Sequence, residues 1–348
     1  MVTSPPVRSA PSVLRGEIGE QPDVVARLLE RERDRIAKLG RALAKGRPAF
    51  VAIAARGSSD NAARYAQYAF GWSCRLPVAL AAPSLTTVYG RPPRLRGALV
   101  IGISQSGRSP DVVETIARAR RDGARTLAIV NDTESPLART AAELIPLHAG
   151  VEKSIAATKT YTAQLTAVAL LAASIARNRA ALGELDLLPR ALAKALESED
   201  SARAAAKDYS SVERAIVIAR GFHHATAHEI ALKLKELALV PAEPYSAADF
   251  QHGPIAMAGS LLHALVVMPP RCAATLELRA LVKELRARGS RVRMIGAGVG
   301  AVPVPELPEW ISPIAAVVPG QWIALHAARA RGLDPDRPRG ISKITETR

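Results

Sequence analysis

The fold class is decided by the stretch ALVIGISQSGRSP at residues 98–110. Its first six residues are apolar or glycine, which is typical of a strand that is buried on both faces. A turn of Ser, Gln and Gly follows, and Ser109 with Pro110 supply the N-cap and the first position that helices favour. A buried strand that turns at once into a helix predicts a βαβ unit in a parallel sheet.

The same pattern recurs on both sides of this stretch. Phe50–Ala55 is an apolar run that leads into Gly57-Ser58-Ser59 and then into a helical pattern from Asn61. Thr126–Val130 is a further apolar run after the central helix. Strands that alternate with helices in this way predict a parallel sheet with helices on both faces.

A second copy of this arrangement follows in the chain. Ala215–Ala219 predicts a strand that ends in Arg220-Gly221, just as the first strand ends in Arg56-Gly57. The wide separation of these two turns indicates a duplicated domain and not a short solenoid repeat. Further strands and the helix between them are expected at His263–Met268, Leu276–Arg288 and Arg291–Ile295.

The chain therefore divides into four expected segments. An N-terminal arm and helix cover residues 1–36, the first α/β domain covers 37–180, the second covers 181–334, and a tail covers 335–348. The Ala-, Arg- and Glu-rich stretch at 177–207 predicts a helical connection between the domains. The tail is rich in Pro, Arg and Lys, so we expect it to be irregular.

Composition excludes several classes of protein. Of the 348 residues, 48% are hydrophobic and 23% are charged, which is ordinary for a globular chain and unlike disordered or collagen-like sequences. The apolar run Leu165–Ala176 is shorter than the ~20 residues of a membrane-spanning helix and predicts a buried helix instead. The start carries no apolar signal segment, and Cys74 and Cys272 lack metal-ligand spacing. We expect a cytoplasmic protein with no membrane partner.

The charge balance is strongly basic, because 47 Lys and Arg against 32 Asp and Glu give a net charge of +15. Such an excess attracts nucleic acids, anionic membranes or phosphorylated small molecules. Aromatic residues make up only 4%, too few for base-stacking platforms, and the arginines are scattered over helical patterns. We therefore expect solvated helix faces and no nucleic acid partner, with an anionic substrate as the open alternative.

The turn after the central strand has the features of a phosphate site. A helix N-terminus preceded by small hydroxyl residues offers backbone N–H groups, side-chain donors and a favourable dipole. The turn lacks the Gly-Lys-Ser/Thr of the Walker loop, and any strand-to-helix turn favours Ser and Gly. The second hydroxyl turn, at 57–59, favours phosphate, because ligands of open α/β sheets bind beyond the carboxyl ends of the strands. The residues concerned are Gly57, Ser58 and Ser59 in one turn and Ser104, Gln105, Ser106 and Ser109 in the other.

A second candidate site lies on the helical pattern at 227–239. At about 100° per residue, Glu229, Lys233 and Glu236 share one stripe of this helix. Spacing alone favours a solvent-exposed ion pair, worth about 0.2–0.5 kcal/mol. The alternative is an enclosed Glu that acts as a base and is tuned by the neighbouring ammonium.

Histidine is the remaining candidate for acid–base chemistry. His252 precedes Gly-Pro, which predicts a rigid loop, and a loop imidazole can exchange protons near neutral pH. His223, His224 and His228 invite a zinc site, but no Glu or Cys stands at metalloprotease spacing. We expect no metal and no cofactor.

Taken together, these residues resemble a known family, the proteins with two sugar isomerase (SIS) domains. They are similar to the isomerase half of glutamine–fructose-6-phosphate aminotransferase and to the glucosamine-6-phosphate deaminases built from that half alone. The resemblance implies two tandem SIS domains, each a parallel sheet flanked by helices in a flavodoxin-like three-layer sandwich. The matching stretches, in family order, are residues 17–22, 56–59, 104–107, 157–159, 231–236, 251–254 and 336–343.

The resemblance also implies roles for the candidate residues. The sugar phosphate would be held by Ser59, Ser104, Gln105, Ser106 and Ser109, with Gly57 in the first turn. Glu236 would move a proton between carbons 1 and 2 of the sugar, supported by Lys233 and Glu229. His252 would assist ring opening, reaching into the site of a neighbouring subunit in a homodimer. Lys343 on the tail would contact the open-chain sugar.

One departure from the family sets the expected activity. The aminotransferases carry an N-terminal glutamine-hydrolysing domain with a cysteine directly after the initiator Met, whereas residue 2 here is Val. Without that ammonia source, the resemblance implies a deaminase, which isomerises glucosamine-6-phosphate and hydrolyses the imine to fructose-6-phosphate and ammonia. A deglycase acting on a fructosamine phosphate, an enzyme for galactosamine-6-phosphate and a non-catalytic sugar-phosphate sensor stay open.

Overall fold

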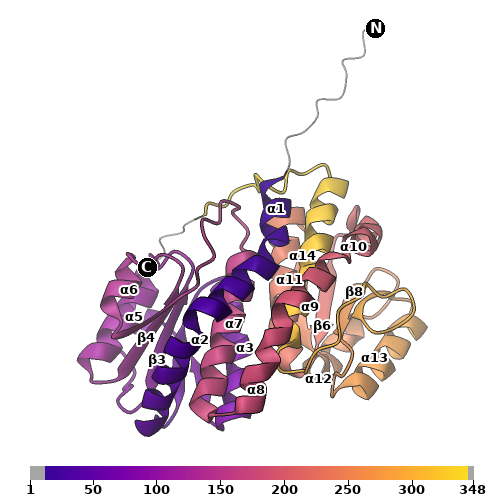
Figure 1. The fold of residues 1–348 in the computed structure, drawn as a ribbon. Helices are drawn as coiled ribbons and strands as arrows, with labels where there is room; N and C mark the ends of the chain where they lie inside the picture. The colour runs from indigo at the N-terminus through magenta and orange to yellow at the C-terminus, as the bar shows by residue number, and fades with distance from the viewer. Residues whose placement is uncertain (1–11, 344–348) are drawn as a thin grey trace.

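The computed structural model describes residues 12–343 and contains two β-sheets with helices packed around and between them (Figure 1). The first sheet has five strands in the order β2-β1-β3-β4-β5, and the second has four in the order β7-β6-β8-β9. Neighbouring strands are parallel throughout both sheets. The predicted α/β fold with a duplicated parallel sheet is confirmed.

The central strands of both sheets are the apolar runs that the sequence predicts, within one residue at either end. Their side chains are buried because helices cover both faces of each sheet. The strand bounds are β1 Val51–Ala54, β2 Val78–Leu80, β3 Leu99–Ser104, β4 Arg125–Val130, β5 Glu143–Pro146, β6 Ala215–Ala219, β7 Ala242–Ser246, β8 His263–Met268 and β9 Arg291–Gly296.

The strand order creates a ligand-binding position in the first sheet. Strand β1 lies between β2 and β3, so the chain leaves it in one direction and later returns on its other side. In open α/β sheets, ligands bind at such a reversal, beyond the carboxyl ends of the two strands. The two hydroxyl-rich turns of the sequence follow β1 and β3, and the fold therefore places them side by side.

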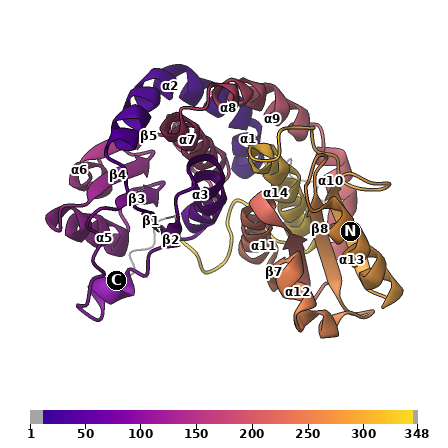
Figure 2. The ribbon, with the colours of Figure 1, turned by 90° about the horizontal axis from the view of Figure 1, so that it is seen from below.

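Helices α3, α7, α11 and α14 lie between the two sheets, and α2 packs against α7 from outside (Figure 2). Helices α7 and α14 are apolar on nearly all sides and are buried along almost their whole length, as expected for helices without a polar face. The packed pairs are α2 with α7, α7 with α3, α3 with α11, and α11 with α14. The bounds are α2 Gln21–Lys45, α3 Ser58–Cys74, α7 Lys159–Ala176, α11 His224–Ala238 and α14 Ser312–Ala330.

Two glycines allow the central helices to pack closely. A Cβ atom at Gly40 of α2 would lie 2.5 Å from the Cβ of Ser174 on α7. A Cβ atom at Gly320 of α14 would lie 2.2 Å from Cγ1 of Ile230 on α11. The catalytic candidate helix α11 is thus held tightly against the interior on one side.

The remaining helices cover the outer faces and connect the halves. The connection predicted at 177–207 consists of short helices, as expected. No helix within residues 12–343 combines the length and the apolar character that crossing a bilayer requires. The bounds are α1 Val13–Gly19, α4 Ser84–Thr87, α5 Pro110–Arg121, α6 Pro136–Thr140, α8 Arg179–Glu184, α9 Leu188–Leu196, α10 Glu199–Ala206, α12 Ala247–Gln251 and α13 Thr275–Ala287.

The structure corrects the predicted start of one helix and adds strands. Helix α3 begins at Ser58 and not at Asn61, because Gly57 adopts a φ of +57° and turns the chain directly from strand to helix. Strands β2, β5 and β7, which the sequence analysis missed, lie at sheet edges. Edge strands tolerate polar residues and proline, so the β7 sequence AEPYS gives no apolar run to recognise.

Candidate active site

The turn after β3, residues 104–109, is held in shape by its own hydrogen bonds, and we call it the phosphate cradle. The Ser104 Oγ accepts the N–H of Gly107 at 3.0 Å, and the Ser106 Oγ accepts that of Arg108 at 3.4 Å. Gly107 adopts a φ of +63°, and a Cβ atom there would lie 2.1 Å from the Oγ of Ser135. Only glycine therefore lets this turn close.

Two predicted phosphate ligands in this turn carry unused side-chain donors. Ser109 is the N-cap residue of α5 by its backbone, yet its hydroxyl makes no capping hydrogen bond. Across residues 12–343, neither the Ser109 hydroxyl nor the Gln105 amide has a hydrogen-bonded partner, and both side chains are half-buried. Donors left open at a helix N-terminus can receive an anion.

An ion pair ties this turn to the turn after β1. The Nε of Arg56 donates to Oδ2 of Asp111 at 2.7 Å, and Asp111 is buried in the first turn of α5. An unpaired carboxylate at this place would repel a phosphate. Arg56 neutralises it and leaves the helix N-terminus attractive to an anion.

The two serines of the first turn face different ways. The Ser59 Oγ is buried and accepts the Nε2 of Gln164, from α7, at 2.9 Å. The neighbouring Ser58 donates to Oε1 of Glu229 at 2.9 Å. Ser58 therefore joins the first half to α11, whereas Ser59, which is predicted as a phosphate ligand, contacts α7.

Helix α11 carries a buried acid–base cluster formed by Glu229, Lys233 and Glu236. The Nζ of Lys233 lies 2.5 Å from Oε2 of Glu236, 3.4 Å from Oε1 of Glu229 and 3.2 Å from the Oγ of Ser58. The Nδ2 of Asn61, on α3, donates to Oε2 of Glu229 at 2.8 Å. Lys233 thus stands between two carboxylates, and the cluster carries one net negative charge when all three groups are ionised.

Burial separates the behaviour of these groups. Glu229 and Lys233 are 0% and 1% exposed, whereas a quarter of the Glu236 side chain is exposed. Burial raises the pKa of Glu229, opposed by Lys233 and by the hydrogen bonds from Asn61 and Ser58. Burial also opposes the charge of Lys233, but the carboxylates of Glu229 and Glu236 outweigh it and raise the pKa of Lys233. Of the two carboxylates in the cluster, only that of Glu236 is partly exposed, so it is the one that a bound substrate can contact.

The interpretation of this stripe as a solvent-exposed ion pair is wrong. Helix α11 lies between α3 and α14, and its Glu–Lys stripe faces the first half of the molecule and not the solvent. Spacing within one helix cannot show this, because the partner residues Ser58 and Asn61 come from a distant part of the chain. The cluster is enclosed, and the role of a glutamate in it as a base stays a prediction.

His252 lies on a loop, as its Gly-Pro sequence predicts. It follows α12, and the next residue, Gly253, adopts a φ of +123°. The side chain is exposed, and the imidazole has no hydrogen bond or ion pair to any residue from 12 to 343. In the part of the chain that the structure describes, no contact therefore joins His252 to Glu236.

The other histidines are set apart by burial. His223 is fully buried with neither ring nitrogen hydrogen-bonded, and burial lowers its pKa to about 3. His224 and His228 lie edge to face, with ring centroids 4.6 Å apart. Within the described range, no group of three or more His, Cys, Asp or Glu side chains is arranged to hold a metal ion.

The tail returns from α14 to the first half of the molecule (Figure 2). There Lys343 contacts the buried carboxylate of Glu152. Its Nζ donates to Oε2 of Glu152 at 2.8 Å and to the carbonyl of Ser154 at 2.6 Å. Sequence reasoning missed Glu152, which lies between β5 and α7. Its only signal was its position a few residues before the matching stretch at 157–159.

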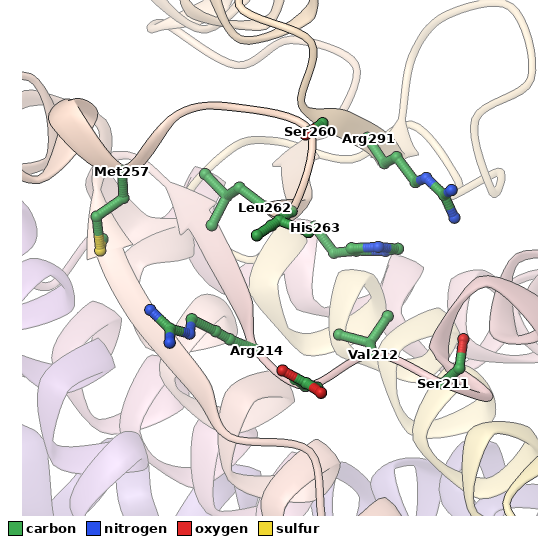
Figure 3. A pocket seen from close by; sticks show the side chains of 10 residues that line it. Ser211, Val212, Arg214, Met257, Ser260, Leu262, His263 and Arg291 are labelled. Atoms are coloured by element: carbon green, nitrogen blue, oxygen red, sulfur yellow. The ribbon is translucent and has the colours of Figure 1, made fainter.

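A separate cavity of about 530 Å³ opens at the opposite end of the second sheet (Figure 3). It lies at the amino ends of β6, β8 and β9, where Arg214, His263 and Arg291 stand among apolar neighbours. The two hydroxyl turns lie instead beyond the carboxyl ends of β1 and β3, and none of the predicted site residues lines this cavity.

Comparison with a family model explains the duplication. The model for the SIS domain matches residues 50–174 and 208–297. The chain belongs to the SIS domain family. The first SIS segment holds β1 to β5 with both hydroxyl turns, and the second holds β6 to β9 with α11. The contacts from Ser58 to the acid–base cluster therefore join the two SIS segments, while Lys343 lies beyond both.

The relatives are sugar-phosphate enzymes. The glutamine–fructose-6-phosphate aminotransferase of Thermus thermophilus is 34% identical over 354 residues, covering 96% of this chain and 58% of the relative. That of Brucella abortus is 32% identical over 353 residues, covering 95% and 58%. The chain thus spans just under three fifths of the length of these curated relatives.

Solved SIS structures share the fold along nearly the whole chain. A crystal structure from Silicibacter pomeroyi, provisionally assigned as a phosphosugar isomerase, has a TM-score of 0.85 and 34% identity, covering 94% of this chain and 100% of that one. The glucosamine-6-phosphate deaminase of Thermotoga maritima has a TM-score of 0.80 at 22% identity, covering 97% and 100%. At that identity the second likeness speaks for the fold alone.

Proposed function

We propose that this SIS protein is a glucosamine-6-phosphate deaminase, which converts its substrate to fructose-6-phosphate and ammonia. The observation that carries the proposal is the junction between the halves. Ser58, beside the candidate phosphate cradle, is hydrogen-bonded to the cluster that presents the Glu236 carboxylate. A phosphate anchor beside a carboxylate base is the arrangement that aldose–ketose isomerisation requires.

Binding begins with the phosphate in the turn after β3. Ser104, Gln105, Ser106 and Ser109 hold it together with the N-terminus of α5, and the basic character of the chain favours an anionic substrate. His252 assists opening of the sugar ring. Because this side chain is exposed and makes no hydrogen bond or ion pair among residues 12–343, we place it in the site of a second subunit of a homodimer.

Proton transfer is the work of Glu236. Its carboxylate takes the proton from carbon 2 of the open-chain aldose while the aldehyde oxygen takes a proton from water, which gives an enolamine with a double bond between carbons 1 and 2. The same group returns the proton to carbon 1 while the amine nitrogen gives up a proton to water, which leaves an imine at carbon 2 and a hydroxyl at carbon 1. Water then adds to the imine, and ammonia leaves to give the ketose. Lys233 keeps the Glu236 carboxylate in place, and Lys343 contacts the open-chain sugar.

The test is ammonia release from glucosamine-6-phosphate, coupled to detection of fructose-6-phosphate, with no added cofactor. Turnover that yields both products in equal amounts supports the proposal. Galactosamine-6-phosphate and a fructosamine phosphate are assayed in parallel. Turnover of one of these alone would replace the substrate and keep the site. Thermal stabilisation by the sugar phosphates without any turnover would overturn the catalytic role and favour a sensor.

A further inference from the structure

We propose that Glu152 is the positioning residue for Lys343, and that its buried carboxylate fixes where the tail ammonium stands in the active site. The inference rests on the proposed function, because it concerns how the same site is completed. It assigns a role to a residue that neither the motifs nor the candidate set singled out.

The Glu152 carboxylate is enclosed and fully used. Its side chain is 0% exposed. Oε1 accepts the backbone N–H groups of Thr158 and Thr160 at 2.9 and 3.2 Å, and Oε2 accepts the Thr160 hydroxyl at 2.8 Å. These donors lie at the start of α7 and hold the carboxylate at the helix N-terminus, where the helix dipole favours negative charge.

The fourth partner of this carboxylate is the Nζ of Lys343, at 2.8 Å. Among residues 12–343, Lys343 is the one cation that contacts Glu152. A buried carboxylate with a single charged partner strongly prefers to keep it, since leaving either group unpaired is costly. Lys343 uses one further donor on the carbonyl of Ser154. An ammonium has three N–H donors, so one remains for a sugar oxygen.

Further hydrogen bonds connect both the tail and the segment that carries Glu152 to helix α1. The carboxylate of Asp336, earlier in the tail, accepts the N–H of Leu14 at 2.8 Å and thereby caps α1. Glu17 of α1 accepts the N–H of Ser154 at 3.1 Å. The tail and the Glu152 segment are therefore both fastened to α1, which sets their separation. These contacts hold the Lys343 ammonium at a defined position beside the Glu152 carboxylate.

The first test is Glu152→Gln, with Glu143→Gln as the matched control on the exposed edge strand β5. Gln keeps one oxygen for the backbone N–H groups of α7 but turns an NH₂ group towards Lys343. We expect kcat to fall about tenfold with KM changed less than about twofold, because the phosphate cradle is untouched. The control should keep wild-type kinetics, and both variants should keep the wild-type Tm within a few degrees.

A double-mutant cycle separates positioning from folding. If Glu152 acts through Lys343, then adding Glu152→Gln to Lys343→Met should change kcat less than about twofold. A full additional loss in that background would overturn the proposal, as would wild-type kcat in Glu152→Gln alone. Should Glu152→Gln lower the Tm markedly, Glu152→Asp takes its place, because it retains the charge but withdraws it from Lys343.

A readout without substrate tests the contact itself. Acetylation of Lys343 by acetic anhydride is followed by mass spectrometry of the tryptic peptide 340–348. We expect labelling several-fold faster in Glu152→Gln than in the wild type or in Glu143→Gln. Faster labelling in a protein that never turns over glucosamine-6-phosphate would keep the positioning and overturn the proposed function. Unchanged labelling in an active enzyme would overturn the positioning and keep the function.

Discussion

The turns after β1 and after β6 occupy equivalent places in the two SIS segments, and they have diverged in chemistry. Both pivot on a glycine with positive φ, Gly57 at +57° and Gly221 at +60°. In the first segment two serines follow, and one of them reaches the acid–base cluster. In the second segment Phe222 and His223 follow, packed against aromatic rings or buried without a hydrogen bond.

This difference favours a division of function, with ligand binding in the first segment and proton transfer in the second. The first segment keeps hydroxyl and amide donors that are open to an anion, which suits binding. The second segment has closed its own turn with bulky side chains and carries buried charge on the following helix, which suits proton transfer. The following experiments test whether binding and proton transfer are separated between the two segments in this way.

The largest effect is expected from Glu236→Gln, which removes the carboxylate base without changing its size. Turnover of glucosamine-6-phosphate should fall by about 10³-fold or more, within the range of a lost general base. Affinity for fructose-6-phosphate, measured by calorimetry, should change less than about twofold. Glu134→Gln, a highly exposed change, is the control. Normal turnover in Glu236→Gln would remove proton transfer from the second segment.

Lys233→Met should destabilise the protein, because it leaves the buried Glu229 without its cation. We expect the free energy of unfolding to fall by about 3–5 kcal/mol, the usual result of breaking a buried ion pair from one side. Urea denaturation measures it, with Lys235→Met on the exposed side of the same helix as the control. Equal stability of the two variants would show that the cluster is solvated, contrary to its burial.

Ser109→Ala should act on binding alone. Its hydroxyl has no partner among the described residues, so the free protein loses no contact and should keep its Tm. A hydrogen bond to a charged phosphate contributes about 1.5–3 kcal/mol, so KM should rise at least about tenfold while kcat stays near the wild-type value. Ser210→Ala serves as the control. A fall in kcat at constant KM would mean that the first segment takes part in the chemistry.

The smallest effect concerns the closed turn of the second segment. Burial lowers the pKa of His223 to about 3. The unfolded chain therefore binds a proton below about pH 6.5 that the folded protein excludes, and stability falls as the pH falls. Between pH 7 and 5.5 we expect His223 to contribute a loss of about 1 kcal/mol.

Urea denaturation at pH 7 and 5.5 measures this contribution of His223. The change His223→Leu should make the pH dependence of the free energy of unfolding shallower, whereas Ser210→Ala, which removes no titratable group, should leave it unchanged. A slope equal to that of the wild type in His223→Leu would show that the imidazole is protonated in the folded state.

Much of the fold was predictable because short stretches of sequence determine its central strands and helices. The central strands are continuous apolar runs, α7 is apolar on nearly all sides, and Ser109 with Pro110 marks the start of α5. Edge strand β7 was not predictable, because an edge strand tolerates the Glu and Pro that a central strand excludes. The predicted domain boundaries stay a prediction.

The site was predictable in residue type and less so in contacts. Motif residues pointed to the turns and to α11, but not to the burial of Glu229 and Lys233, which depends on a helix from the other half. The roles of Ser58 and Glu152 depend on contacts 171 and 191 residues away along the chain. No local pattern encodes such distances.

The return of the tail has a consequence for the order in which the protein is made. Glu152 leaves the ribosome 191 residues before Lys343, its partner. The first sheet and its phosphate cradle can therefore assemble while the tail is still being synthesised. Lys343 is the last of the candidate site residues to be synthesised, so a chain that stops before it can carry a complete cradle and still lack this ammonium.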